Sequence, residues 1–288
     1  MASDNRFAVL IDADNVSVKY IKIILDEISK DGIATYKRIY GDWTNPSLIS
    51  WKSVLLDNSI NPIQQYSYTT GKNSTDSAMI IDAMDILYSG KVDGFCLVSS
   101  DSDFTRLAAR LRESGMTVIG MGESKTPNSF IAACNKFKYL DILSAADEEE
   151  PEEALAPKPE PAKKAAPQKK APQKKAAAAK KAKEEPKPEK EQKAEPKRQQ
   201  QEEIEEPRTS LRTIRRALRT IVRENSDEDD WIIIGKIGNL LDKRYPDFDV
   251  RNFGFSKLTP FLESLDMFEI RDMKKDGNSS PQKYVRLK

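Results

Sequence analysis

The chain has 288 residues, a length that suits two domains of ordinary size. Its 47 lysines and arginines nearly balance its 46 aspartates and glutamates, and histidine is absent. The absence of histidine excludes Ser-His-Asp hydrolysis, Cys-His proteolysis and zinc sites with imidazole ligands. Cys96 and Cys134 are too few for a disulfide framework, and their apolar neighbours predict buried thiols in a reducing compartment.

Residues 1–144 alternate between strand and helix patterns. Continuous and shorter apolar runs predict strands at 7–12, 34–40, 60–66, 94–100 and 116–122. Apolar residues at helical spacing follow each strand, and the last of these helices is expected near 128–135. This alternation predicts an α/β domain with a parallel sheet of about five strands and helices on both faces.

Residues 145–207 have a different composition. They contain no aromatic residue, and Leu155 and Ile204 are their only large aliphatic residues. Such a segment cannot bury enough apolar surface to offset its ordering entropy, so we expect a disordered charged linker that spans roughly 45 Å as a coil. Residues 163–183 hold nine lysines and no acid. They are interpreted either as a solubilising spacer or as a tether for nucleic acid, since clustered lysines release counterions from phosphates.

Residues 208–288 form a third segment, with 17 basic and 13 acidic side chains. The apolar spacing from Leu211 to Val222 predicts an amphipathic helix with five arginines on its polar side. Further elements are expected in chain order, with helices at 231–245 and 256–265 and a hairpin of strands at 267–271 and 283–287 around 276–278. Three helices and a hairpin indicate a small domain like a winged helix.

Neither export nor membrane insertion is predicted. The apolar run at 7–11 is too short for a signal peptide, and no window approaches the roughly 18 apolar residues of a membrane-spanning helix. We therefore expect a soluble cytoplasmic protein without a membrane partner.

Aspartates gather where the strands of the first segment end. Asp12 closes the first strand, Asp101 and Asp103 follow the fourth, and Asp76 begins the helix before the fourth. Open parallel α/β sheets bind ligands at the carboxyl ends of their strands, so these carboxylates are expected to converge. Converging carboxylates repel one another unless a cation is bound or some are protonated. Because the donors are all oxygen, the pattern favours Mg²⁺ or Mn²⁺, which stabilise charge on a phosphoryl centre.

The same aspartates have a plainer interpretation. Asp76 and Asp101 stand where an aspartate caps a helix, and Asp103 has the alternative of pointing along a helix surface. Asp82 and Asp85, which are i,i+3 neighbours, are expected to face solvent.

The stretches FAVLIDADN, STDSAMIIDAM, GFCLVSSDSDFTRLAARLRESGMTVIGMG and FIAACNKFKYL keep one order and spacing over residues 6–143. Together they resemble the NYN domain of the LabA-like family, which belongs to the PIN-like nuclease class. The resemblance implies metal-dependent cleavage of RNA. The residues that it implies for the divalent-metal pocket are Asp12, Asp76, Asp101 and Asp103, and Asn15 would orient water or phosphate.

Polar residues beside the expected site are candidate RNA contacts. Lys72 and Ser74 stand just before Asp76, and Ser124 and Lys125 follow the fifth strand. The plainer interpretation is that both groups belong to ordinary polar loops.

The stretch RYPDFDVRNFGFSKLTPFLESLDMFEIR and the terminal KYVRLK, with Trp231 ahead of them, resemble the OST-HTH or LOTUS domain over residues 208–288. That resemblance implies a winged helix associated with RNA binding, and in some members with protein partners. A net charge of +4 is compatible with phosphate binding, although the arginines also suit a solvated helix face. The candidate RNA contacts are Arg215, Arg219, Arg251 and Lys257, whereas Trp231, Phe248, Phe253 and Phe255 are interpreted as core.

The sequence therefore predicts a ribonuclease that depends on Mg²⁺ or Mn²⁺ and is directed to RNA by its C-terminal domain and its lysine-rich segment. One alternative is an RNA-binding adaptor without catalysis. A less favoured alternative is a phosphatase of the haloacid-dehalogenase type, because Asp12-x-Asp14 fits its nucleophile motif but no threonine follows at the expected place. Protein partners and self-association stay open.

Overall fold

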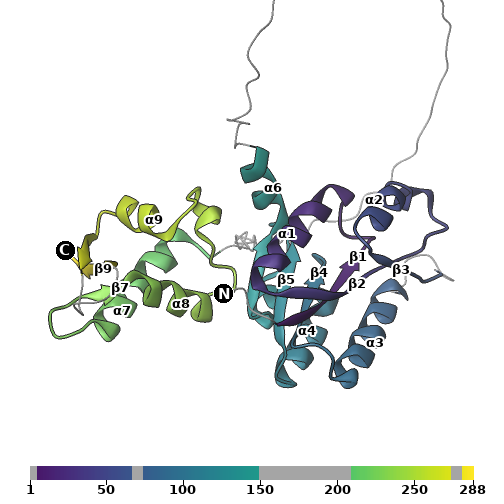
Figure 1. Cartoon of the computed structure of the whole chain (residues 1–288), viewed down its shortest axis with the longest axis horizontal. Helices are drawn as coiled ribbons and strands as arrows, with labels where there is room; N and C mark the ends of the chain where they lie inside the picture. Colours follow the sequence, from purple (N-terminus) through teal and green to yellow (C-terminus); the bar gives the residue numbers. More distant parts are fainter. Residues whose placement is uncertain (1–4, 67–73, 149–208, 274–280) are drawn as a thin grey trace, which may run out of the picture. The chain divides into compact units, whose positions relative to one another are not determined.

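The computed structural model describes residues 5–66, 74–148, 209–273 and 281–288 (Figure 1). Most of the predicted linker at 145–207 and the predicted turn at 276–278 lie outside these residues. Residues 145–148 are described, and they continue a helix instead of beginning the linker.

The N-terminal domain, residues 5–148, follows the predicted alternation of strands and helices. Its strands are β1 (Arg6–Asp12), β2 (Ile33–Gly41), β3 (Asn61–Gln64), β4 (Gly94–Val98), β5 (Thr117–Gly122) and β6 (Lys136–Tyr139). Its helices are α1 (Ile21–Asp31), α2 (Trp51–Asp57), α3 (Ser74–Ser89), α4 (Thr105–Glu113), α5 (Asn128–Ala133) and α6 (Leu140–Glu148), with short 3-10 helices η1 (Val18–Tyr20), η2 (Pro46–Leu48) and η3 (Ser102–Phe104).

The strands pair in parallel in the order β3-β2-β1-β4-β5-β6. The chain first builds outward from β1 through β2 and β3, and then crosses back to add β4, β5 and β6 on the other side of β1. The direction of growth therefore reverses between β1 and β4. In open α/β sheets, this reversal leaves a crevice at the carboxyl ends of the two strands, where ligands bind.

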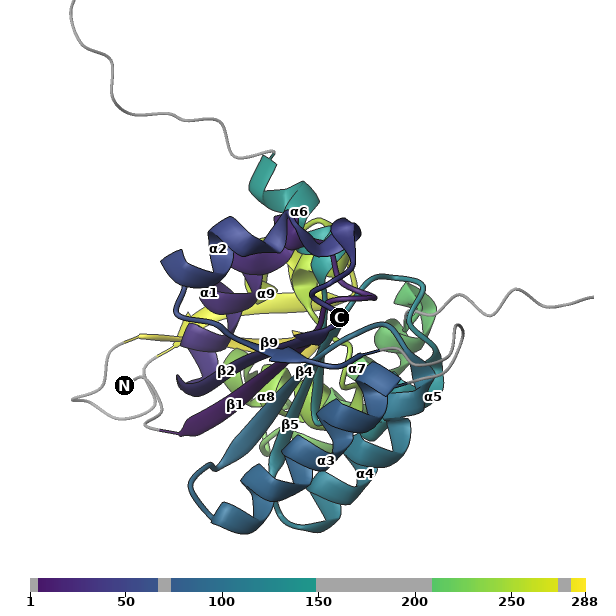
Figure 2. The ribbon, with the colours of Figure 1, turned by 90° about the vertical axis from the view of Figure 1, so that its right-hand side faces the viewer.

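Alternate residues of the central strands enter cores on opposite faces of the sheet. In β1, Val9 and Ile11 pack with α1, α2 and α6, whereas Ala8 and Leu10 pack with α3, α4 and α5. Figure 2 shows these two groups of helices on either side of the sheet. Because both faces are covered, β1 and β4 need apolar residues at successive positions, which explains their unbroken hydrophobic runs.

Two elements at the end of this domain, β6 and α6, were not predicted. β6 is only four residues long, and in it Lys136 and Lys138 alternate with the buried Phe137 and Tyr139. A short edge strand that carries lysines gives a weak strand pattern, although such residues protect an edge from unwanted pairing. The five predicted strands are present, and β6 brings the described sheet to six.

The two cysteines are buried and free, as the sequence predicted. Burial raises the pKa of both Cys96 and Cys134 to about 12. The thiols are therefore protonated at neutral pH and act as small apolar side chains.

The C-terminal domain is described at residues 209–273 and 281–288. Its elements are α7 (Leu211–Asn225), β7 (Ile232–Ile233), α8 (Ile234–Arg244), η4 (Val250–Phe253), α9 (Leu258–Ser264), β8 (Phe268–Met273) and β9 (Gln282–Leu287). The three strands form an antiparallel sheet in the order β7-β9-β8. The helix expected at 231–245 begins later, because the first residues of that stretch pair with β9 as a strand.

The aromatic residues of this domain lie in its core, as predicted. Trp231 is buried, and Phe248, Phe253 and Phe255 all surround the buried ring of Phe261. Phe248, Phe253 and Phe255 are half-buried and pack against the buried core of the domain.

None of the helices in the described ranges has the length and apolar character that crossing a bilayer requires.

The fit of β4 against its neighbours predicts a stability difference between two glycine positions. A Cβ on Gly94 would lie 2.6 Å from the backbone oxygen of Thr117 and 2.5 Å from the ring of Phe7, whereas a Cβ on Gly235 in α8 meets nothing within 4 Å. We expect Gly94→Ala to lower the free energy of unfolding by about 1–3 kcal/mol through overpacking. Gly235→Ala, the matched control, should leave it unchanged or raise it by about 0.5–1 kcal/mol. Denaturant unfolding measures both, and equal effects would contradict the packing argument.

Candidate metal centre

Asp12, the last residue of β1, has a fully buried side chain. Its Oδ2 accepts hydrogen bonds from Asn15 Nδ2 at 2.7 Å and Ser99 Oγ at 2.8 Å, and its Oδ1 accepts one from the Asp14 amide at 3.1 Å. Burial raises the pKa of Asp12 and the charge of Asp14 adds to this, while the hydrogen bonds from Asn15, Ser99 and the Asp14 amide oppose the rise. Asp12 is thus held firmly at the reversal point of the sheet.

Three further aspartates come together at the same edge of the sheet. Asp76 lies in the first turn of α3, Asp101 precedes η3, and Asp103 lies within η3. Each offers a carboxylate oxygen, and the three oxygens lie within 4.8 Å of one another. Asp76 is buried, Asp101 is half-buried and Asp103 is exposed, so the cluster opens toward solvent on one side.

The cluster concentrates negative charge at one edge of the sheet. Burial raises the pKa of Asp76 to about 6, and the charges of Asp12, Asp101 and Asp103 contribute in that order, followed by Asp14. This also shows that Asp12 acts on Asp76 electrostatically, although it is not among the three residues whose oxygens approach most closely. A divalent cation would relieve the repulsion. The all-oxygen donor set, with one open side for water, fits Mg²⁺ or Mn²⁺.

The capping interpretation of Asp101 is correct. Its Oδ1 accepts a hydrogen bond from the Asp103 amide at 2.9 Å, and its own amide donates to Ser99 Oγ at 3.1 Å. A carboxylate has about four acceptor positions, so one bond to an amide leaves room for a cation. The cap fixes the turn that presents both acids.

The end of β5 supports this turn from the other side. A Cβ on Gly122 would lie 2.7 Å from both Ser99 O and Thr126 Oγ1, so no side chain fits there without displacing the turn. The Glu123 amide then donates to Ser100 Oγ at 2.9 Å. Ser99, which the sequence analysis gave no role, therefore links β1, the acidic turn and β5. Its place directly after an apolar strand and two residues before Asp101 was the signal available in the sequence.

A second overlooked residue is Thr75. It is buried, and its hydroxyl donates to Asp14 Oδ2 at 2.9 Å. This bond ties the start of α3 to the loop after β1, which places Asp76 beside Asp12.

Asp82 on α3 takes part in structure instead of facing solvent. It accepts hydrogen bonds from Tyr40 Oη and from Arg38, whose guanidinium lies over the ring of Tyr36 at 5.3 Å. These contacts fasten α3 to β2 six residues after Asp76. Asp85, by contrast, is exposed as expected.

The predicted RNA contacts have varied surroundings. Lys125 pairs with Glu123 at 2.8 Å, and the Ser124 amide donates to Asp141 Oδ1 at 3.1 Å. Ser74 begins α3 beside the acidic cluster, and Lys72 lies outside the described residues. In the C-terminal domain Arg215, Arg219 and Lys257 are exposed, whereas Arg251 pairs with Asp249 at 2.6 Å.

The parallel α/β sheet with an acidic cluster at the carboxyl ends of its strands is the arrangement that the NYN resemblance implies. Family models match an NYN domain at residues 6–141 and an OST-HTH/LOTUS domain at residues 208–279. The chain therefore contains an NYN domain and a C-terminal OST-HTH/LOTUS domain, in agreement with both resemblances.

Other comparisons add little. A comparison with curated proteins finds no match. Among solved structures, a protein of unknown function from Vibrio parahaemolyticus is 20% identical, with a TM-score of 0.40 over 48% of this chain and 96% of that one.

The raised pKa of Asp76 predicts that the stability of the domain depends on pH. Its folded-state pKa of about 6 exceeds the ordinary value of 3.8, so the metal-free native state binds its proton more tightly than the unfolded chain does. Stability contributed by Asp76 is therefore complete below about pH 4 and is lost as the pH rises through 6. In EDTA near pH 7.5, we expect Asp76→Asn to raise the free energy of unfolding by on the order of 1–2 kcal/mol, and to have little effect near pH 4.

Asp85→Asn on the exposed side of α3 serves as the control. It should leave the free energy of unfolding unchanged both near pH 7.5 and near pH 4. The same unfolding experiment with Mg²⁺ should stabilise the wild type more than the Asp76→Asn variant. A variant that gains no stability near pH 7.5 would show that the carboxylates do not repel one another as the geometry indicates.

Proposed function

We propose that the protein is a divalent-metal-dependent ribonuclease that is directed to RNA by its OST-HTH/LOTUS domain and its lysine-rich segment. The single observation that carries the proposal is the convergence of Asp76, Asp101 and Asp103 beside the buried Asp12, at the reversal point of an NYN sheet. The family match argues against the phosphatase alternative, and so does Asp12, whose two oxygens are engaged in hydrogen bonds.

The residues of the cluster have separate roles in this proposal. Asp76, Asp101 and Asp103 hold Mg²⁺ or Mn²⁺, and Asp12 strengthens the negative potential behind Asp76. A bound divalent cation lowers the pKa of water and stabilises negative charge on a phosphoryl group. Asp103 is the exposed member of the cluster, so the phosphate and the attacking water would enter the site on its side.

Asn15 is a positioning residue for the same reaction. Its side chain is exposed but held by the hydrogen bond to Asp12, so its amide keeps one orientation at the edge of the site. The amide is suited to orient water or a phosphate oxygen. Hydrolysis then adds water across a P–O bond and leaves a phosphate on one product and a hydroxyl on the other.

Removal of the central acids should abolish cleavage. We expect Asp12→Ala and Asp101→Ala each to lower the rate of Mg²⁺- or Mn²⁺-dependent cleavage of labelled RNA by about 10²-fold or more, because each removes charge from the cation site. EDTA should have the same effect on the wild type. The conservative variant Asp12→Asn, which keeps the shape of the buried side chain, should also be inactive.

Asp85→Ala is the control, since Asp85 is exposed on α3 away from the cluster. Circular dichroism and thermal unfolding check that each variant is folded. Unchanged cleavage in folded Asp12→Ala and Asp101→Ala would contradict the enzyme and favour the RNA-binding adaptor. Labelled DNA in parallel assays tests whether the substrate is confined to RNA.

The lysine-rich segment should contribute to affinity through charge. Deletion of residues 163–183 removes nine lysines, so we expect weaker RNA binding and a shallower fall of log K with log salt. Binding is measured with the Asp12→Asn protein in EDTA from about 50 to 300 mM KCl. A replacement of the nine lysines by glutamine is the length-matched control and should act like the deletion. An unaltered salt slope would show that the segment does not contact RNA and is only a spacer.

A further inference from the structure

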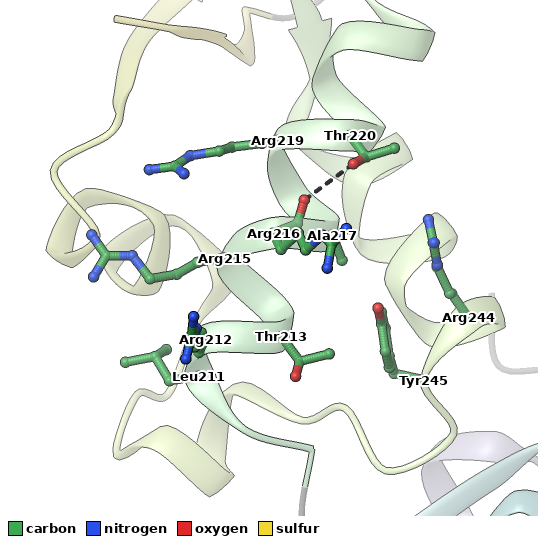
Figure 3. A pocket seen from close by; sticks show the side chains of 10 residues that line it. All are labelled: Leu211, Arg212, Thr213, Arg215, Arg216, Ala217, Arg219, Thr220, Arg244 and Tyr245. Carbon is green, nitrogen blue, oxygen red and sulfur yellow. Dashed lines mark hydrogen bonds between the residues drawn. The ribbon is translucent and has the colours of Figure 1, made fainter.

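A basic hollow lies on the surface of the C-terminal domain. It has a volume of about 1170 Å³ and is lined by α7 and by the last residues of α8 (Figure 3). The lining residues include no carboxylate. Five arginines contribute to it, all of them exposed: Arg212, Arg215, Arg216, Arg219 and Arg244. Figure 3 shows Arg215 and Arg219 extending to one side of α7 while Arg244 and Tyr245 stand on the other.

The amphipathic pattern of α7 creates this surface. Ile214, Leu218 and Ile221 are buried in the domain core, so the arginines are confined to the solvent side. Positions 212, 215, 216 and 219 have i, i+3, i+4 and i+7 spacing and thus share one face. At a rise of about 1.5 Å per residue they extend over about 10 Å, a length over which one nucleic-acid strand presents more than one phosphate.

The hollow differs from the remaining basic surface of the domain in its charge balance. The hairpin of β8 and β9 is the wing of the domain. In the wing, Arg271 and Arg286 both pair with Glu269 and lie over the ring of Trp231. Arg251 pairs with Asp249. Within the described ranges, by contrast, no carboxylate approaches the guanidinium groups of the hollow within 4 Å. Arg215 donates to the carbonyl oxygen of Leu265, which leaves its charge in place.

This arrangement is unfavourable for the free domain. Arginines at i,i+3 and i,i+4 spacing repel one another, and Arg212 lies in the first turn of α7, where the helix dipole is positive. Each effect costs a few tenths of a kcal/mol, and a bound anion would remove both costs. The geometry therefore favours a ligand with several negative charges in a row.

We propose that the phosphate backbone of RNA crosses this hollow, so that α7 and the end of α8, and not α9 and the wing, form the main RNA-binding surface of the domain. The inference rests on the proposed RNA-directed function and names the surface that serves it. The guanidinium groups of Arg212, Arg216 and Arg219 contact successive phosphates. Arg244 lies near Tyr245, at 6.0 Å from its ring centre, and the Tyr245 hydroxyl supplies a further donor on the opposite wall.

The test compares two triple variants of the full-length chain that remove equal charge. In the hollow variant, Arg212, Arg216 and Arg219 are replaced by glutamine. In the second variant, called the wing variant, glutamine replaces Lys257 at the start of α9 and Arg271 and Lys283 in the wing. Both carry Asp12→Asn, and binding to a labelled single-stranded 20-mer RNA is measured in EDTA from about 50 to 300 mM KCl. Circular dichroism and thermal unfolding confirm that each protein is folded.

We expect the hollow variant to bind at least tenfold more weakly than the parent near 100 mM KCl, with a salt slope that is smaller by about 2, since each lost phosphate contact on a single strand changes the slope by about 0.7. The wing variant should change affinity less than threefold. Equal weakening in both variants, or greater weakening in the wing variant, would overturn the proposal. Relief of repulsion should keep the melting temperature of the hollow variant equal to or above that of the parent.

Two further measurements separate the possible explanations. A polyglutamate of matched charge should compete poorly with the RNA, and equal competition would overturn RNA as the occupant in favour of an acidic protein segment. Cleavage is assayed separately with proteins that retain Asp12. Loss of binding in the hollow variant supports the RNA surface even if the wild type cleaves nothing. If the wild type cleaves RNA but the hollow variant binds RNA as tightly as the parent, the nuclease is supported and this surface is rejected.

Discussion

Several carboxylates lie close together where the order of the sheet reverses between β1 and β4. Their mutual repulsion is the main constraint on the candidate site of the N-terminal domain. The fold cannot relieve it by moving the acids apart, because each one is fixed by its own contacts. Asp12 is buried and bonded to Ser99, while Asp76 is placed by the start of α3. Burial, and after it the charges of the neighbouring aspartates, raises the pKa of Asp76 to about 6. A site that keeps this cost without a cation would be unusual, since buried charges are normally paired or bound to metal.

Structural and functional interpretations of the same aspartate do not exclude each other in this site. Asp101 caps η3 with one oxygen, and this cap is what fixes the turn that faces Asp76. Asp82 shows the opposite case, because its contacts with Arg38 and Tyr40 are purely internal to the fold. The difference between them lies in position. Asp101 follows a central strand at its carboxyl end, whereas Asp82 lies two turns along a helix and reaches the neighbouring strand β2.

Much of the fold could be predicted from hydrophobic periodicity, because β1 and β4 are buried on both faces and α7 is strongly amphipathic. β6 could not, since a four-residue edge strand with alternating lysines has little apolar signal. Asp12, Asp76 and Asp101 were recognisable from their places at strand and helix ends. Strand order was not, and so the sequence could not decide that Asp76, Asp101 and Asp103 approach one another most closely while Asp12 lies buried beside them.

The two domains have clusters of opposite charge, and an RNA strand with its cations would satisfy both. The acidic cluster needs a cation, whereas the arginines of α7 need an anion and have no carboxylate partner among the described residues. About three phosphate contacts give weak binding at physiological salt, with dissociation constants on the order of 10⁻⁴ to 10⁻⁶ M for non-specific sites. Because the domains belong to one chain, RNA that is held by one of them is presented to the other at a raised effective concentration. In the proposed function, a C-terminal module of low affinity therefore raises the concentration of RNA at the N-terminal domain and still releases the products.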